Sequence, residues 1–356
     1  MAGMSRLLRF GVLGAGQISR YACPEINGHP QARVVAASDP NPERLAELSR
    51  LFGGLRTHLD SAALLADKEI DVVYIATPNA LHTPQALAAL SAGKHVIIEK
   101  PFATSAAEAR AVLEQAERAS RLVSVAMNQR FRADSQRVAQ LVERGGLGRV
   151  YHADAYWCRR AGIPKLGSWF CNKALAGGGA LYDIGVHVLD LALFAMNRFD
   201  PISLSGQART EFGARGLGEG GWGLSEREHG FDVDDSASAL LRFADGATLS
   251  LEVSWARHQP EADRMNVVLH GTGAAAGCFP GELYRAGTEP GVFETCTLGN
   301  AALRYPHESR FHNFIGAILG TETLCVSPAQ ALAVQRILDA IYESSRLGRE
   351  VMLSQP

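Results

Sequence analysis

The chain has 356 residues, which at about 150 residues per domain predicts two domains. Hydrophobic residues make up 47% and charged residues 20%, so the composition excludes disorder and predicts a sizeable buried core. The 35 basic and 37 acidic residues leave a net charge of −2, which gives no basic field for a nucleic-acid backbone. We therefore expect no nucleic-acid partner.

The sequence shows no pattern typical of a signal peptide or a membrane helix. The apolar run 10–16 contains three glycines, so it predicts a strand and a turn rather than a signal peptide. No apolar run reaches the roughly 18 to 20 residues that a membrane helix needs. Six scattered cysteines without a CxxC pair are typical of buried thiols in a reducing compartment. We expect a cytoplasmic protein with no membrane partner.

The first third of the chain alternates short apolar runs with segments of helical periodicity. This alternation predicts a doubly wound α/β Rossmann domain, with a parallel sheet and helices on both faces, over residues 1–127. The expected strands are 7–13, 33–38, 71–76, 95–98 and 122–126, and the expected helices are 17–27, 42–52, 84–92 and 105–120.

After residue 127 the pattern changes to that of an α+β domain, expected over residues 128–327. Asp245-Gly246 between two alternating runs predicts a hairpin in an antiparallel sheet with one open face. A last helix is expected within 328–356, packed back on one of the domains. The other expected elements here are helices 134–144 and 180–196 and strands 149–157, 236–243, 247–255 and 265–270.

A glycine turn follows the first predicted strand and opens the first predicted helix. Gly14 permits the tight turn, and Gly16 allows a pyrophosphate to approach the backbone N–H groups of Gln17 and Ile18. Ser19 stands where the dinucleotide fingerprint has its third glycine, and its side chain is small enough for the same close packing. The turn predicts a dinucleotide site.

Asp39 closes the second predicted strand, where a carboxylate can accept hydrogen bonds from the adenosine ribose. A carboxylate also repels a 2′-phosphate, so we expect NAD rather than NADP. The alternative is that the glycines form only a turn and that Asp39 only caps the helix that follows.

Lys100 follows directly on the strand 95–98 and precedes Pro101. Ligands of doubly wound sheets bind beyond the carboxyl ends of the strands, so Lys100 is expected at the mouth of that crevice. Proline restricts the preceding residue to extended conformations. A lysine at a strand end can also be simply solvated.

Asp183 and His187 follow a run of three glycines and lie one helical turn apart. A carboxylate beside a histidine fixes its tautomer and raises its basicity, which suits a general base acting on an alcohol. The alternatives are a helix cap with a buried histidine, or a zinc site. Catalytic zinc needs three protein ligands and no third is evident, so no metal is expected.

In this order the motifs resemble the Gfo/Idh/MocA family of NAD(P)-dependent oxidoreductases, which includes glucose–fructose oxidoreductase and inositol dehydrogenase. The resemblance covers nearly the whole chain. It rests on the glycine turn, Glu99-Lys100-Pro101, the glycine run into Asp183 and His187, and the segments 76–82, 128–131 and 271–273.

The resemblance implies a role for each matching residue. Lys100 is expected to touch the nicotinamide ribose and the substrate hydroxyl, and His187, partnered by Asp183, to take the hydroxyl proton. The implied second domain holds a large, mostly antiparallel sheet whose open face joins copies into a homodimer or homotetramer. The residues implied to line the dinucleotide are Thr77, Asn79, His82, Glu99 and, near the nicotinamide, Arg130.

The implied activity is hydride transfer between NAD and a secondary alcohol of a sugar, an inositol or a sugar derivative. Two alternatives are an NAD-dependent glycosidase of the same family and a non-catalytic sugar or dinucleotide sensor. A sensor has no use for a lysine, a carboxylate and a histidine arranged for proton transfer. Side chains on or beside the loop expected over the substrate are weaker candidates for contact with it: Trp157, Arg159, Arg160, Trp169, Lys173 and Tyr182.

Overall fold

The computed structural model describes residues 7–223, 230–299 and 301–353, which form two compact units. The first unit contains Met1–Ala126 and Ser309–Leu332, and the second contains Met127–Glu308 and Ala333–Pro356. The division after residue 126 lies one residue from the predicted boundary. The segment 309–332, by contrast, lies in the first unit, whereas the sequence had suggested that most of it belongs to the second domain.

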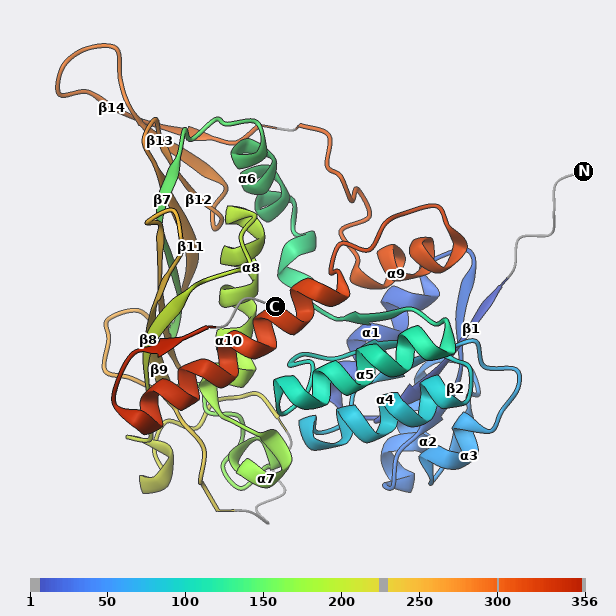
Figure 1. The fold of residues 1–356 in the computed structure, drawn as a ribbon. Coiled ribbons are helices and arrows are strands. Elements are labelled where there is room, and N and C mark those ends of the chain that lie inside the picture. The colour runs from blue at the N-terminus through green and yellow to red at the C-terminus, as the bar shows by residue number, and fades with distance from the viewer. Residues whose placement is uncertain (1–6, 224–229, 300, 354–356) are drawn as a thin grey trace, which may run out of the picture. The chain divides into compact units, whose positions relative to one another are not determined.

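The first unit is built on a six-stranded parallel sheet in the order β3-β2-β1-β4-β5-β6 (Figure 1). This order is that of a Rossmann sheet, and it confirms the predicted fold class. All five predicted strands are present, and β3 is an additional short edge strand. The strands are β1 Leu8–Leu13, β2 Ala32–Ser38, β3 Arg56–His58, β4 Val72–Ile75, β5 His95–Ile98 and β6 Val123–Val125.

Helices cover both faces of this sheet. Side chains of α1, α2 and α9 share one apolar core with β1, β2 and β4, and α4 and α5 lie side by side (Figure 1). Phe311 and Phe314 of α9 are fully buried in this core, which explains why the chain returns to the first unit. The helices are α1 Gln17–Asn27, α2 Pro42–Leu51, α3 Ser61–Leu65, α4 His82–Ser91, α5 Ala106–Ala119 and α9 Arg310–Leu319, with a 3₁₀ turn η1 Asn79–Leu81.

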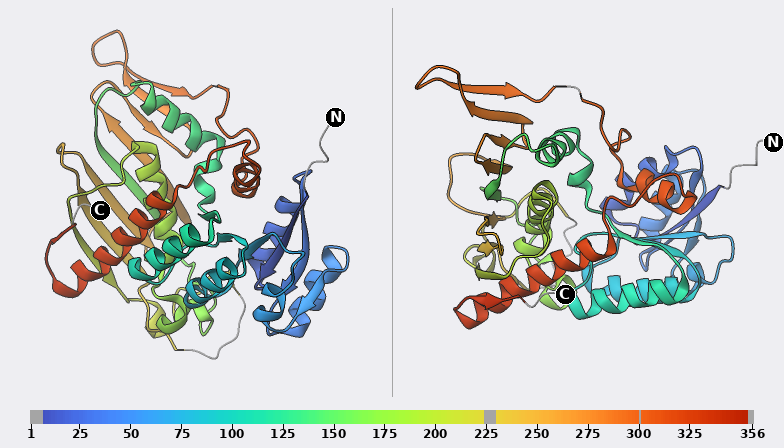
Figure 2. Two further views of the ribbon diagram at one scale, coloured as in Figure 1. Left: turned by 45° about the vertical axis from the view of Figure 1, so that its right-hand side comes forward. Right: turned by 45° about the horizontal axis from the view of Figure 1, so that its top comes forward.

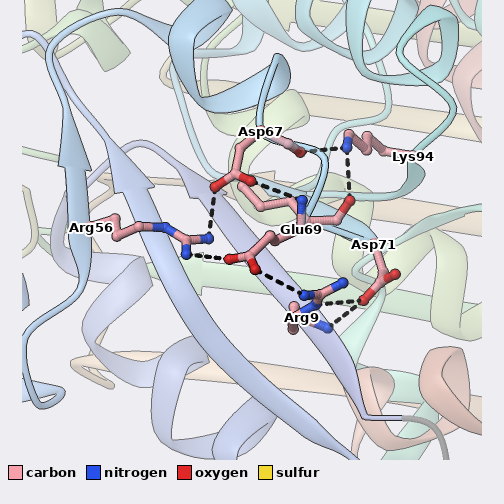
Figure 3. A network of polar contacts seen from close by, with 7 residues as sticks. Arg9, Arg56, Asp67, Glu69, Asp71 and Lys94 are labelled. Carbon is pink, nitrogen blue, oxygen red and sulfur yellow. Dashed lines mark hydrogen bonds and ion pairs between the residues drawn. The ribbon is translucent and has the colours of Figure 1, made fainter.

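A polar network joins the amino ends of the strands in the first unit (Figure 3). Arg56 pairs with Asp67 and Glu69 at 2.6 Å each, and Arg9 pairs with Asp71 at 3.4 Å. The buried Lys94 donates to the backbone oxygen of Asp67 at 2.6 Å. These contacts lie at the edge opposite to the one where ligands of such sheets bind, so the network has a structural role.

The second unit is built on a nine-stranded sheet in the order β14-β13-β12-β11-β7-β10-β9-β8-β15. Its described pairs are antiparallel except for β7 and β10, which run parallel. The predicted hairpin joins β9 to β10 through Gly246, whose φ is +84°. The strands are β7 Val150–Arg159, β8 Ser203–Arg209, β9 Ser236–Arg242, β10 Thr248–Ser254, β11 Asp263–Gly271, β12 Ala275–Gly277, β13 Glu282–Ala286, β14 Phe293–Thr297 and β15 Val351–Met352.

Helices α6 and α8 run along one face of this sheet (Figures 1 and 2). Alternation along the strands turns Ala153 and Leu249 to that face and His152 and Thr248 to the open one. The helical segments are α6 Ala133–Glu143, α7 Lys173–Ala176, a π-helical turn η4 Leu181–Gly185, α8 Val186–Met196 and α10 Pro328–Leu347, with 3₁₀ turns η2 Asn128–Phe131, η3 Trp169–Cys171 and η5 Gly213–Arg215.

The stretch Lys173–Met196 is long and apolar enough to cross a membrane by length and composition, although the sequence had suggested no such segment. Its apolar window is 83% buried inside the structure. Burial of this extent is expected of a core helix, whose apolar residues surround its whole circumference.

Candidate functional site

The predicted cofactor residues of the first unit lie at the carboxyl edge of its sheet. Leu13 at the end of β1 is in register with Ser38 on one side and Ile75 on the other, and Ile75 is in register with Ile98. Gly14, Asp39, Thr77 and Lys100 therefore follow neighbouring strand ends. This edge, beside β1 and β4, is where the strand order reverses and where such sheets bind nucleotides.

The glycine turn has the geometry that a dinucleotide needs. Gly14 has a φ of +96°, and a Cβ placed there would lie 2.5 Å from the carbonyl oxygen of Ala76. A Cβ at Gly16 would meet no atom within 4 Å, so the space beside it is open. The first turn of α1 contains no acidic residue. No side chain caps α1, so the backbone N–H groups of Gln17 and Ile18 in its first turn fit a diphosphate, and the turn fits NAD.

Asp39 is buried, and its carboxylate braces the glycine turn. It accepts hydrogen bonds from the backbone N–H groups of Ala15 at 2.8 Å and Asn41 at 2.9 Å. The helix cap is Asn41, whose side chain accepts from Glu43 and Arg44. The alternative that Asp39 only caps the helix is therefore wrong. Each carboxylate oxygen has a second lone pair, so Asp39 can still accept hydrogen bonds from a ribose.

Glu99 is the centre of a buried network that the sequence did not reveal. Its carboxylate accepts from the Tyr74 hydroxyl at 2.7 Å and from the backbone N–H of Lys100 at 3.3 Å, and it lies 3.6 Å from the Arg310 guanidinium. Burial, followed by the charge of Glu99, raises the pKa of Tyr74 well above its usual value. This network fixes the backbone at Lys100. Arg310 also pairs with Glu25 at 3.2 Å.

His82 links two loops at the same edge. It is buried, with Nδ1 2.9 Å from the carbonyl oxygen of Pro101 and Nε2 3.1 Å from that of Thr77. Burial lowers the pKa of His82, so the neutral ring donates to one carbonyl at a time. His82 therefore lies between the backbone after β4 and the proline that follows Lys100, and it hydrogen-bonds one of the two at a time. The hydroxyl of Thr77 donates to Gln85 at 2.7 Å, and Asn79 is buried in the 3₁₀ turn.

In the second unit, Asp183 and His187 stand out from a buried helix. Both are partly exposed, whereas the other residues of 178–193 are buried. The backbone around Asp183 is a π-helical turn rather than the predicted α-helix. Such turns are frequent at functional sites. Asp183 accepts a hydrogen bond from the indole N–H of Trp255 at 2.9 Å.

The glycine run before Asp183 is packed against protein atoms. A Cβ at Gly179 would lie 1.8 Å from the carbonyl oxygen of Asp234, and one at Gly178 would lie 2.1 Å from the hydroxyl of Tyr342. The buried carboxylate of Asp234 accepts from Gly179 at 2.8 Å, from Leu181 at 2.9 Å and from the Tyr342 hydroxyl at 2.6 Å. Asp234 and Tyr342 therefore hold the start of the π-helical turn.

Trp157, at the end of β7, lies beside His187, with ring centroids 5.8 Å apart. Its indole N–H donates to Asp263 at 2.9 Å, and the Arg159 guanidinium lies 4.7 Å from the centre of its ring. Arg159 in turn approaches Asp263 at 3.6 Å. The His187 ring thus borders an aromatic surface rimmed by one cation and one carboxylate.

Comparison with known proteins identifies the family. Residues 8–127 match the oxidoreductase family with an NAD-binding Rossmann fold, and residues 135–276 match the GFO/IDH/MocA C-terminal domain. The chain belongs to the Gfo/Idh/MocA family.

This Gfo/Idh/MocA member is similar to proteins named as sugar dehydrogenases. It is 30% identical to D-glucoside 3-dehydrogenase from Escherichia coli over 97% of each chain. It is 34% identical to levoglucosan dehydrogenase from Pseudarthrobacter phenanthrenivorans over 68% of this chain and 63% of that one. A levoglucosan dehydrogenase structure with NADH and levoglucosan superposes with a TM-score of 0.84, at 27% identity over 98% of this chain and 100% of the other.

Other predicted residues of this Gfo/Idh/MocA chain point into its own interior. Arg130 is fully buried and forms an ion pair with Asp190, two hydrogen bonds joining the pair. Tyr182 is buried, and its hydroxyl donates to Asp339 at 3.1 Å and accepts from Gln335 at 2.9 Å. These contacts give both residues structural roles, and their contacts with cofactor or substrate stay predictions.

The three remaining substrate candidates lie elsewhere in the second unit. Arg160 is exposed and donates to the backbone oxygens of Gln259 and Pro260. Trp169 stacks on Phe170 with ring centroids 3.8 Å apart, and Lys173 is exposed at the start of α7. Substrate contact remains a prediction for each of them.

Proposed function

We propose that this chain is an NAD-dependent dehydrogenase that oxidises a secondary alcohol of a neutral sugar or sugar derivative. The observation that carries the proposal is that Asp183 and His187 are the two partly exposed side chains of the otherwise buried stretch 178–193. A carboxylate and an imidazole retained at the surface of an apolar core are groups that the fold itself does not require.

The first unit would hold the cofactor through its glycine turn and Asp39. The N–H groups at the start of α1 would bind the diphosphate, and the Asp39 carboxylate the adenosine ribose. When bound, the nicotinamide ring supplies hydride transfer chemistry. Asp39 disfavours a 2′-phosphate, which supports NAD over NADP. Asn79, His82 and Glu99 are proposed to shape the pocket wall around the dinucleotide.

The proton chemistry falls to three side chains. His187 takes the hydroxyl proton, Asp183 favours the protonated imidazole that results, and Lys100 stabilises negative charge on the alcohol oxygen. Lys100 belongs to the first unit and the other two residues to the second. Their meeting at one substrate is the central claim of the proposal.

The substrate class is supported by the surface beside His187 and by the relatives. An aromatic ring rimmed by Arg159 and Asp263 suits a polyhydroxylated ring, because the guanidinium donates to hydroxyl groups and the carboxylate accepts from them. Arg159 and Asp263 together carry no net charge, which favours a neutral sugar over a phosphorylated one. The names of the similar dehydrogenases, glucoside and levoglucosan, agree with this class.

We also infer that copies of the chain associate through the open face of the nine-stranded sheet. That face carries Asp154 between His152 at 3.2 Å and His270 at 3.0 Å. Polar side chains of this kind suit a partner surface that offers hydrogen bonds. The dimeric or tetrameric state and the cytoplasmic location remain predictions.

The test is a panel of aldoses, glycosides and polyols followed at the NADH absorbance, with NAD and NADP side by side. We expect NADH formation with at least one neutral sugar and a preference for NAD. Lys100→Met should lower turnover by about 10³-fold or more and leave NAD affinity nearly intact. Near-normal turnover in that variant would remove Lys100 from the mechanism.

The same panel separates the alternative functions. A glycosidase would release the glycone without net NADH formation, and a sensor would bind NAD or sugar without turnover of either. Either outcome, obtained with folded protein, would replace the dehydrogenase proposal.

A further inference from the structure

In the second unit, β7 and β10 form the single parallel pair among the described strands, and this pair brings two tryptophans to the edge of the sheet where both strands end. Ser254 at the end of β10 is in register with Cys158 near the end of β7, so Trp255 and Trp157 lie beside that edge. The indole of Trp255 is fully buried and its Nε1 lies 2.9 Å from Oδ2 of Asp183. The backbone N–H of Trp255 donates to the backbone carbonyl oxygen of Asp235 at 2.8 Å, which fixes the residue from a second direction.

An indole N–H is a donor only, and it cannot exchange roles with its partner. A hydrogen bond from it stabilises the ionised form of Asp183, because the protonated carboxyl is the weaker acceptor. The bond also limits rotation of the carboxylate. Trp255 thus meets the two requirements of an orienting group, a fixed position and a fixed direction of donation.

We infer that Trp255 is a positioning residue that holds Asp183 as an oriented carboxylate for His187. The consequence for turnover rests on the proposed function, whereas the contact itself does not. Asp183 lies in a π-helical turn, where the side-chain spacing differs from that of an α-helix. The spacing of an α-helix therefore does not orient the Asp183 carboxylate. The indole N–H of Trp255, from outside the turn, supplies that orientation.

The other titratable groups packed around this turn have partners of their own. Asp234 is bound by Gly179, Leu181 and the Tyr342 hydroxyl, and Tyr182 is bound by Asp339 and Gln335. The second indole at this edge, Trp157, donates to Asp263. Among the described contacts, the indole N–H of Trp255 donates to one carboxylate, that of Asp183.

The contact can be tested without cofactor or substrate, by NMR of protein labelled with ¹⁵N at its four indole nitrogens. Trp255→Phe assigns the Trp255 signal by its disappearance; if that variant fails to fold, phenylalanine variants of the other three tryptophans assign it by exclusion. Asp183→Asn should move the Trp255 proton signal upfield, because a hydrogen bond to a neutral acceptor is weaker. The Trp222 signal should stay in place. An unmoved Trp255 signal would overturn the inference.

The effect on turnover is tested with the best sugar of the panel. Trp255→Phe should lower kcat about tenfold, leave KM and NAD affinity unchanged, and move the acid limb of the pH profile to higher pH. Without its donor, the Asp183 carboxylate binds a proton more tightly, so it also attracts a protonated imidazole beside it more strongly. The pKa of that imidazole therefore rises, and the acid limb moves with it. Trp222→Phe, a variant at a tryptophan 36% exposed, is the matched control and should behave as the wild type.

Three outcomes separate the possible explanations. A fall in kcat with an unmoved acid limb and a lower melting temperature would assign Trp255 a merely structural role and overturn the inference. Unchanged kcat and an unmoved limb would do the same. A sugar panel without any turnover would contradict the proposed function, and the NMR comparison would then decide the contact alone.

Discussion

Two glycine motifs in this chain have opposite surroundings. At Gly16 in the first unit, an added Cβ would meet no atom within 4 Å. At Gly178 and Gly179 in the second unit, it would lie 2.1 Å and 1.8 Å from protein atoms. The first motif leaves room for something outside the protein, and the second is filled by the protein itself. A glycine-rich segment therefore indicates a ligand site only where the space beside it is open.

The comparison also separates two ways in which backbone N–H groups are used. Those of Gly179 and Leu181 already donate to the buried carboxylate of Asp234. The first turn of α1 has a glycine N-cap, which offers no side-chain acceptor, and no acidic residue. Only the start of α1, after the Gly14–Gly16 turn, leaves donors for a diphosphate. Substitution of glycine by alanine at Gly179, Gly14 and Gly16 tests this difference between filled and open surroundings.

Gly179→Ala should have the largest effect. The new Cβ would lie 1.8 Å from a backbone oxygen that cannot rotate away, so we expect a loss of about 3 kcal/mol or more in the free energy of unfolding. Urea denaturation measures it. The matched control is Gly221→Ala, where no atom lies within 4 Å and the change should stay within about 0.5 kcal/mol. Equal stability of the two variants would contradict the packing of this run.

Gly14→Ala should be the next most damaging. Its φ of +96° costs an alanine about 1–2 kcal/mol, and the contact with Ala76 adds to that cost. We expect a loss of about 2–3 kcal/mol in thermal or urea unfolding, together with weaker NAD binding. A variant as stable as the wild type would show that the turn relaxes easily.

Gly16→Ala should change binding without changing the fold. Its backbone is extended, at φ −73° and ψ −173°, and the site of the new Cβ is open. Stability should rise by less than about 1 kcal/mol or stay unchanged. NAD affinity, measured by calorimetry, should fall at least tenfold, because the methyl group occupies the approach of the diphosphate. Wild-type affinity would contradict the assignment of this turn to NAD.

Asp39→Asn should have the smallest effect on NAD affinity in the series. Ala15 and Asn41 donate to different oxygens of the carboxylate, and the amide keeps an oxygen for only one of them, so the fold should persist with a loss of about 1 kcal/mol in the free energy of unfolding. Loss of the charge should raise the dissociation constant of NAD about fivefold, or about 1 kcal/mol, and narrow the preference over NADP. Unchanged affinity for both cofactors would refute the ribose assignment.

The alternation of apolar runs and helical segments was sufficient to predict the Rossmann sheet. The five strands other than β3 were predicted because their burial on both faces leaves continuous apolar runs. The edge strand β3 was missed because Arg56–His58 is short and partly exposed. The place of helix α9 in the first unit was missed because its contacts with β1 and β4 are remote in sequence, and only the folded chain brings Phe311 beside Tyr74.

In the candidate site, too, residues marked by the local sequence were predicted, and residues that act from distant segments were not. Gly14, Asp39 and Lys100 were found because they stand next to strand ends, which the sequence reveals. Trp255 and Asp234 were missed because each acts on the turn at Asp183 from a distant strand or loop. The π-helical turn was also missed, since periodicity does not distinguish it from an α-helix over five residues.

The most direct test of the central claim is a crystal structure of the protein with NADH and the sugar that the panel identifies. The measurement is the pair of distances from the reacting hydroxyl oxygen to Nζ of Lys100 and to the imidazole of His187. We predict that both distances fall within hydrogen-bond reach, about 2.6–3.2 Å. A hydroxyl within reach of only one of these groups, or of neither, would contradict the account.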